Sequence, residues 1–239
     1  MISYYNTIND IKTDTVIIPV GSIEQHGSHL PTGTDYLIIK KLSEEVAKEI
    51  NAYLLPPMPF STCYEHKGTK GCARLRPSTF QLFLTDLILD LRDQGFKKFI
   101  VMIGHGGIFI AGPAIRELNA MYDDLEVIKI ENLVNDEIRA VMTGAPFDEI
   151  HAGESETSMV LAIAEDSVKK DEMMKNDFIP SCPREYLNYA PLPTLSPTGV
   201  WGLPSHATKE KGEKLIELKV KEALRKIEDA FKYTKPEKW

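Results

Sequence analysis

The feature that most constrains the fold is a recurring unit: a short apolar run, then a glycine-rich turn carrying histidine or carboxylate side chains, then a segment with helical spacing. The run at 16–20 leads into a turn over 21–35, and the run at 98–103 leads into Gly-His-Gly-Gly at 104–107. Short apolar runs bounded by turn residues are typical of buried strands. Because strands that alternate with helices usually form a parallel sheet, the pattern predicts a three-layer α/β protein with a mostly parallel central sheet.

The same pattern can be followed along the whole chain. Strands are predicted at 15–20, 52–55, 98–103 and 125–130. Helices are predicted at 35–51, 78–94, 111–122, 134–142, 154–164 and 208–233. Two polar or proline-rich stretches, 59–77 and 177–204, are expected to be long excursions, and loops of this length are often functional. No second core-sized segment follows them, so residues 1–239 are predicted to form a single domain.

Composition excludes several classes of function. The 239 residues are 43% apolar, which suits one large α/β domain, and the formal net charge of −7 argues against binding to nucleic acid. No basic stretch followed by an apolar run opens the chain, and no apolar run is long enough to span a membrane. The three cysteines show no C-x-x-C spacing, so a reduced, cytoplasmic location is expected.

Candidate ligands gather where predicted strands give way to predicted helices. Glu24 and His26 are two residues apart, so in extended backbone their side chains point the same way. Asp35 follows nine residues later, at a predicted helix start. His105 has glycine on both sides, and these glycines allow a close approach of the backbone.

A third junction lies at 151–158, where His151 is followed by Glu154 and Glu156. Spacing alone does not choose between the two carboxylates. Because such junctions meet along one edge of a parallel sheet, we expect the three sets of side chains to converge. Mixed imidazole and carboxylate ligands suit Zn, Mn or Fe, and five ligands with one shared carboxylate suit two metal ions. A metal pair activates water and polarises a carbonyl group, so hydrolysis is the expected chemistry.

These motifs resemble those of the creatininase family. Residues 21–35 read Gly-Ser-x-Glu-Gln-His-Gly-x-His-Leu-Pro-x-x-x-Asp, and 104–107 read Gly-His-Gly-Gly. Residues 151–158 read His-Ala-Gly-x-x-Glu-Thr-Ser. A C-terminal block follows, with Gly-Val-x-Gly-x-Pro at 199–204 and Ala-Thr-x-Glu-Lys-Gly at 207–212. The resemblance covers nearly the whole chain in order, and its first motif is long enough to be highly specific.

The resemblance implies a ligand set. Asp35 would bridge two divalent metal ions, with Glu24 and His105 completing one site and His26 and Glu156 completing the other. Zinc is the expected metal, with manganese or iron as alternatives.

The resemblance also implies a reaction. The fold would be creatininase-like, and the substrate a small molecule with a cyclic amide, formamide or related C–N bond other than a peptide bond. A hydroxide bridging the metals would attack the carbonyl carbon, and His151 would carry protons to the leaving nitrogen. The family often forms hexamers, so a homo-oligomer is expected.

Some positions depart from the family pattern. Creatininase itself has an acidic residue where this chain has Gly107 and a tryptophan where it has Phe147. Both differences argue against creatinine as the substrate. Many relatives also carry asparagine where this chain has Ile103 and Ile108, so polar partners of the ligands are missing here.

Substrate contacts are harder to predict. Glu65 and His66 are expected to line the substrate pocket, with a surface loop as the alternative, and Trp201 would line the pocket or pack in the core. His29 is interpreted as structural or as a hydrogen-bond partner of a ligand, rather than as a ligand itself. His206 is interpreted as structural, although it lies near a motif that could close over the site.

Two other functions stay open at the level of sequence. The same ligand types could serve a metal-dependent isomerase or lyase acting on a sugar, whose product would contain no oxygen from solvent. The chain could also be a non-catalytic, oligomeric metal or ligand binder. Retention of five candidate ligands argues against this last alternative.

Overall fold

Five parallel strands form the central sheet of the protein, for which a computed structural model describes residues 1–234. Every pairing between neighbouring strands is parallel. β2 and β4 pair in register over six residues, so their carboxyl ends lie side by side at the middle of the sheet. The strand order is β1 (Ile2–Ser3), β3 (Tyr53–Leu54), β2 (Thr15–Val20), β4 (Lys98–Ile103) and β5 (Glu126–Ile130).

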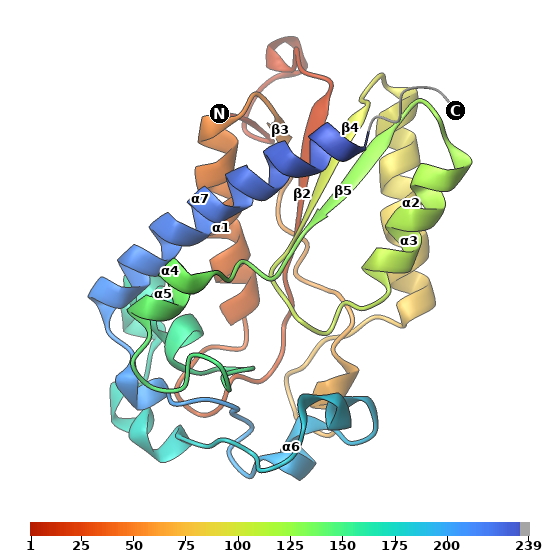
Figure 1. Cartoon of the computed structure of the whole chain (residues 1–239). Coiled ribbons are helices and arrows are strands. Elements are labelled where there is room, and N and C mark those ends of the chain that lie inside the picture. Colours follow the sequence, from red (N-terminus) through yellow and green to blue (C-terminus); the bar gives the residue numbers. More distant parts are fainter. Residues whose placement is uncertain (235–239) are drawn as a thin grey trace.

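Helices cover both faces of the sheet, as Figure 1 shows. One layer consists of α1 (Thr34–Glu49), α4 (Asp136–Val141), α5 (Glu154–Ala164) and α7 (Lys209–Tyr233). The other layer consists of α2 (Pro77–Asp93) and α3 (Ala111–Met121). The single-turn α6 (Leu192–Leu195) lies away from both layers, in the long excursion before α7.

The alternation of side chains along the strands explains the two layers. Successive residues of a strand point to opposite faces of the sheet. In β2, Ile17 joins the core beneath α1, α5 and α7, whereas Val16 and Ile18 join the core beneath α2 and α3. All three are buried. In β4, the residues that point alternately to the two cores are buried as well. A strand that is apolar on both faces is what a helix-covered parallel sheet requires.

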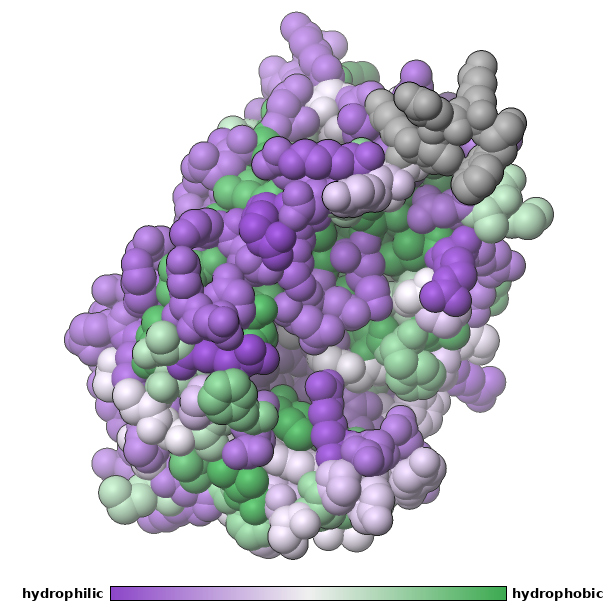
Figure 2. Space-filling model, viewed as in Figure 1, coloured by the Kyte–Doolittle hydropathy of each residue, from purple (hydrophilic) through white to green (hydrophobic). Residues whose placement is uncertain are grey.

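Helix α7 has one apolar and one charged face. Leu215 and Ile216 are buried against the sheet side of the molecule. Its outward Lys and Glu residues belong to a surface that is largely hydrophilic in the view of Figure 2. Within residues 1–234, no helix combines the length and the apolar composition that a membrane crossing needs.

Two glycines allow the strand ends and α1 to approach closely. The Gly104 N–H donates to the Val20 carbonyl at 2.8 Å, so the ladder continues one residue beyond β4. A Cβ on Gly104 would lie 2.7 Å from the Ile39 Cβ, and one on Gly21 would lie 2.8 Å from the Tyr36 Cα. Any larger residue would push α1 away from the ends of the strands.

The predicted elements agree closely with the structure. The strands at 15–20 and 98–103 and the helix at 154–164 have the predicted bounds. Most other bounds differ by one or two residues, and the sheet is wholly parallel rather than mostly so. The last helix begins one residue later than predicted because Thr208 caps it, accepting a hydrogen bond from the Lys211 N–H at 3.2 Å.

The sequence did not predict β1, which is a two-residue edge strand, or the short helix α6. Neither is long enough to show a periodicity. The predicted single domain over 1–239 includes residues 235–239, which lie outside the described residues.

The core analysis predicts a clear difference between two truncations. Ile100→Ala removes a fully buried side chain from β4 and should lower the free energy of unfolding by about 2–5 kcal/mol. Leu82→Ala, at a position of α2 that is 63% exposed, should cost less than about 0.5 kcal/mol. Urea unfolding followed by circular dichroism measures both, and equal losses would contradict the assignment of the core.

Candidate metal centre

The loop after β2 folds back on itself and brings three acidic or imidazole side chains together. The Glu24 N–H donates to the Thr32 carbonyl at 2.9 Å, which closes the loop. Gly27 has a φ of 69°, a conformation that glycine adopts without strain. Glu24 and His26 are fully buried, and Asp35 follows in the first turn of α1.

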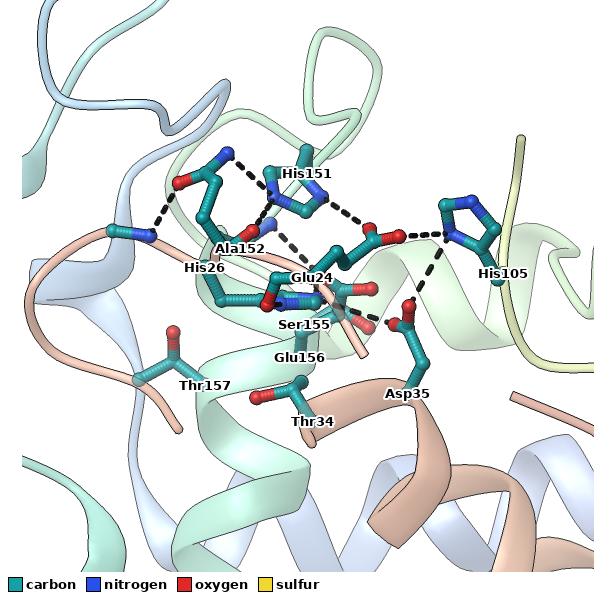
Figure 3. A network of polar contacts seen from close by, with 12 residues as sticks. Glu24, His26, Thr34, Asp35, His105, His151, Ala152, Ser155, Glu156 and Thr157 are labelled. Carbon is teal, nitrogen blue, oxygen red and sulfur yellow. Dashed lines mark hydrogen bonds and ion pairs between the residues drawn. The ribbon is translucent and has the colours of Figure 1, made fainter. Parts of the chain in front are cut away.

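The two carboxylate oxygens of Asp35 face two different imidazoles, as Figure 3 shows. Asp35 Oδ1 lies 3.2 Å from His26 Nε2, and Asp35 Oδ2 lies 3.2 Å from His105 Nδ1. Glu24 Oε2 is 3.1 Å from the same nitrogen of His105. Glu156 Oε2 lies 3.9 Å from His26 Nε2 on the other side. The five expected ligands therefore converge as two groups that share Asp35.

Several of these atoms are buried without a hydrogen-bond partner among the described residues. They include both carboxylate oxygens of Glu24 and Oδ2 of Asp35. An unpaired buried carboxylate is costly, because its charge has been removed from water. A cation placed between these oxygens and the imidazole nitrogens would supply the missing partner. The donor set is of the mixed imidazole and carboxylate kind that suits Zn, Mn or Fe.

Backbone groups orient His26 toward Asp35. His26 Nδ1 lies 3.2 Å from the Glu24 carbonyl oxygen, to which its N–H can donate. This leaves a lone pair on Nε2, the atom that faces Asp35 and Glu156. Such a hydrogen bond on the far nitrogen is typical of metal-binding histidines.

Charges inside the site offset the effect of burial on its titratable groups. Burial acts to raise the pKa of Glu24, but His105 and His66 hold that pKa well below its usual value. Burial acts to lower the pKa of His26, but Asp35 and Glu156 raise it to about 9. The pKa of His105 is likewise raised, against burial, by Glu24 and Asp35. The carboxylates therefore favour a positive charge among them.

His151 lies beside the ligands, and its pKa is shifted in the opposite direction to those of His26 and His105. Its Nε2–H donates to the Gln25 carbonyl oxygen at 2.7 Å, and its Nδ1 lies 3.8 Å from Glu24 Oε1. Burial and the neighbouring His26 and His66 hold the pKa of His151 well below its usual value. His151 is therefore a neutral imidazole with a free lone pair on Nδ1.

The structure shows which of Glu154 and Glu156, the two carboxylates that spacing could not distinguish, belongs to the site. Glu156 Oε2 accepts a hydrogen bond from the Ala152 N–H at 2.6 Å and lies on the side of His26. Glu154 points away and accepts from the backbone N–H groups of Thr143 and Gly144. Its negative charge is also paired with Lys211.

His66 contacts the ligand group, and Gln25 orients it. His66 Nε2 lies 3.0 Å from Glu24 Oε1. The Gln25 side-chain amide donates to the Gly199 carbonyl at 2.8 Å and lies 3.0 Å from His66 Nδ1. This arrangement makes Nδ1 the acceptor, so the proton of a neutral His66 is on Nε2, the nitrogen close to Glu24. Gln25 was missed at the level of sequence because strict alternation would place it on the opposite side from Glu24 and His26.

The remaining sequence candidates lie at the edges of the site. Trp201 is buried, and its backbone forms a two-way bridge with that of His151. It is not among the residues that line the cavity described below, and its predicted substrate contact stays a prediction. His29 Nε2 lies 3.0 Å from Thr157 Oγ1, and burial lowers the pKa of His29 to about 4. His206 is exposed and contacts Thr143.

A cavity of about 780 Å³ opens onto the ligand group. Its volume suits a small molecule. Arg184, from the excursion before α7, lines this cavity and a second one of about 590 Å³ beside it. Candidate site residues in the wall of the first cavity are Asp35, Glu65, His66, His105, His151 and Glu156.

Comparison with known proteins assigns the family. The sequence model of the creatininase family, described as creatinine amidohydrolase, matches residues 5–227. The chain belongs to the creatininase family. It is therefore a member of a family of hydrolases that act on carbon–nitrogen bonds other than peptide bonds.

Two curated relatives are similar over much of the chain. A 3-dehydro-scyllo-inosose hydrolase of Thermotoga maritima is 31% identical over 158 residues, which are 64% of this chain and 51% of the relative. The chain thus spans about half the length of that relative. A creatinine amidohydrolase of Pseudomonas putida is 27% identical over 234 residues, covering 90% of this chain and 89% of the relative.

A solved structure confirms the predicted fold. It is described as a mutant creatininase of Zn–Zn type, with 26% identity and a TM-score of 0.75. The similarity covers 91% of each chain. The predictions of family, fold class and enzyme class are therefore confirmed.

The shared position of Asp35 predicts a graded loss of metal. Asp35→Asn should lower the divalent metal bound to the purified protein more than His26→Ala, because Asp35 faces both histidine groups and His26 faces one. Elemental analysis measures the metal content of each variant. His206→Ala changes an exposed histidine and should leave the metal content unaltered. Full metal content in Asp35→Asn would contradict the geometry.

Proposed function

We propose that this protein is a metal-dependent amidohydrolase that cleaves a C–N bond, in a cyclic amide, formamide or related group, of a small molecule. One observation carries the proposal: the buried Asp35 presents its two oxygens to two separate imidazoles, 3.2 Å away on each side. A carboxylate shared in this way is what a two-metal site requires. The cavity above it gives a small substrate access.

The proposed cofactor is a pair of divalent cations. Glu24, Asp35 and His105 would hold one, and His26, Asp35 and Glu156 the other. Zinc is proposed first, supported by the Zn–Zn form of the related creatininase structure, with manganese or iron as alternatives. Bound cations of this kind lower the pKa of water and polarise a carbonyl oxygen.

His151 is the proposed proton carrier. Its Nε2–H is held by the Gln25 carbonyl, so the ring cannot turn freely and the lone pair on Nδ1 points toward Glu24. A neutral imidazole in this place can take a proton from attacking water and pass it to the departing nitrogen. Glu24 remains ionised beside it because His66 and His105 hold its pKa low.

The proposed substrate is a small molecule other than creatinine. At the two positions where creatininase differs, this chain presents no acidic or indole side chain to the cavity, since Gly107 has none and Phe147 is not in the cavity wall. Phe147 is 79% exposed, and the Arg139 Cζ lies over its ring, 5.2 Å from the ring centroid. The space beside Gly107 is taken by Glu65. Arg184 and Lys67 line the cavity together with carboxylates such as Glu65 and Glu185, so its wall would favour a strongly polar substrate.

A second candidate substrate class comes from the Thermotoga maritima relative, whose name gives an inosose as its substrate. In a cyclic, sugar-like ketone, which has no C–N bond, the activated water would add to a ring carbonyl and break the adjacent C–C bond. The leaving carbon would then take a proton from His151 to give a ring-opened acid. This candidate takes the place of the sugar isomerase or lyase as the main alternative, since the relative is named a hydrolase. We also propose a cytoplasmic homo-oligomer, a hexamer by resemblance to the family.

The proposed use of water predicts an isotope result. When active substrates are found in a panel of amides, formamides and inososes, turnover in ¹⁸O-labelled water should place one labelled oxygen in the acyl product, measured by mass spectrometry. Hydrolysis requires this incorporation, whereas isomerisation does not. Complete turnover without label would overturn the hydrolase proposal in favour of an isomerase or lyase.

The proposed proton transfer predicts separate effects on rate and on metal. His151→Ala should lower kcat about 10²- to 10⁴-fold, because general acid–base catalysis contributes an effect of this size. The metal content should remain that of the wild-type protein, since His151 is placed beside the cations. Steady-state kinetics and elemental analysis on the same preparation test both, with His206→Ala as the matched histidine control. A normal kcat in His151→Ala would remove His151 from the mechanism.

A further inference from the structure

The space next to Gly107 is filled by a carboxylate from a distant loop. A Cβ on Gly107 would collide with Glu65 Oε1 and with His105 Nε2. Glu65 lies in a single helical turn, Tyr64–His66, within the polar stretch at 59–77. The Thr62 hydroxyl donates to the Gly107 carbonyl at 2.8 Å, which ties this stretch to the loop after β4. Glycine at 107 is therefore what allows Glu65 to reach His105.

Glu65 belongs to a group with metal-binding geometry. Glu24, Glu65 and His105 each offer one ligand atom, and these atoms all lie within 4.8 Å of one another. Glu65 Oε1 is 2.9 Å from His105 Nε2, whereas Nδ1 of the same ring faces Glu24 and Asp35. Glu65 Oε1 and His105 Nε2 are both buried, and neither has a hydrogen-bond partner of acceptable geometry within residues 1–234. The Glu65 carboxylate is therefore placed to add negative charge behind a ring whose Nδ1 would hold a cation.

Charge balance supports the same assignment. Two divalent cations would bring four positive charges into a largely buried site. Glu24, Asp35 and Glu156 supply three negative charges, and Glu65 can supply the fourth while the bound water is still neutral. Buried charges are tolerated when they are compensated locally, so the set with Glu65 is the neutral one before the water loses its proton.

We propose that Glu65 is the charge partner, acting through His105, of the cation held by Glu24 and His105, and that Gly107 makes room for it. Creatininase itself carries an acidic residue at the position of Gly107, so in this chain the carboxylate enters from 59–77 instead. The inference rests on the proposed function, which supplies the cation. It assigns to Glu65 a role in metal binding rather than the substrate contact expected from sequence.

The main alternative is that Glu65 only orients the His105 ring by accepting its Nε2–H. A carboxylate–histidine pair of this kind is common around metals. The two roles differ in what they require. An orienting acceptor can be a neutral amide, whereas a charge partner must be ionised, so Glu65→Gln separates them.

The experiment measures the zinc affinity of the full chain by competition with a chromophoric chelator. Glu65→Gln should weaken binding at the affected site by about tenfold or more, because the amide keeps the acceptor and loses the charge. Glu185→Gln removes an exposed carboxylate from the wall of the same cavity and should leave the affinity unchanged. Unchanged affinity in Glu65→Gln, with normal binding by the wild-type protein, would overturn the inference.

Gly107→Ala provides an independent test of the coupling. Its new methyl group should displace Glu65 and also press on the His105 ring, so it should weaken zinc binding at least as much as Glu65→Gln does. The double variant Glu65→Gln with Gly107→Ala should then be no worse than Gly107→Ala alone, because the methyl group has already removed the Glu65 contact. Additive losses would show that Gly107 acts by another route and would overturn the proposed pairing.

The outcomes distinguish this inference from the proposed function. If the wild-type protein binds no zinc above background, the proposed function fails and the inference fails with it. If the wild-type protein binds zinc and Glu65→Gln binds it equally well, only the inference fails. Thermal unfolding of the metal-free variants should match that of the metal-free wild-type protein, which excludes a loss of folding as the cause.

Discussion

The rest of the structure depends on the burial of several carboxylates at the carboxyl end of a parallel sheet. Glu24 and Asp35 are almost completely excluded from solvent, yet several of their oxygens lack a hydrogen-bond partner in the described part of the chain. Such an arrangement is stable only if positive charge compensates it. The protein meets part of this need with His26 and His105, whose pKa values the carboxylates raise. A divalent cation would meet the remainder.

Much of the fold could be predicted because its signals are local. Apolar runs buried on both faces mark β2 and β4, and a four-residue spacing marks α1. Glu24, His26, Asp35 and His105 could also be predicted from position, because they follow the ends of β2 and β4, which a parallel sheet brings to one edge. Their convergence follows from the register of β2 against β4, which places His105 next to the loop that carries Glu24. The third expected strand-to-helix junction is wrong, because α5, which carries Glu156, follows helix α4.

The rest of the site depends on long-range contacts that leave no pattern in the sequence. Nothing in the sequence near Gly107 indicates that Glu65, which lies in the loop before α2, fills the space beside it. Gln25 lies in a turn, where the alternation of an extended strand does not hold, and so reaches His66. The choice of Glu156 over Glu154 depends on Thr143 and Lys211, which give Glu154 other partners.

The centre also draws its members from widely separated parts of the chain. Residues 24 and 35 follow β2, residue 105 follows β4 and residue 156 lies in α5, and the bridge between His151 and Trp201 adds a fourth segment. These connections must all dock before the cluster exists, and pairing of distant residues is slow because the loop-closure entropy is lost before the contacts form. Ion capture should therefore act on the finished fold, slowing its unfolding while leaving the rate of its formation nearly unchanged. In the cell, such an ion would slow the unfolding of folded molecules and would not assist the folding of newly made chains.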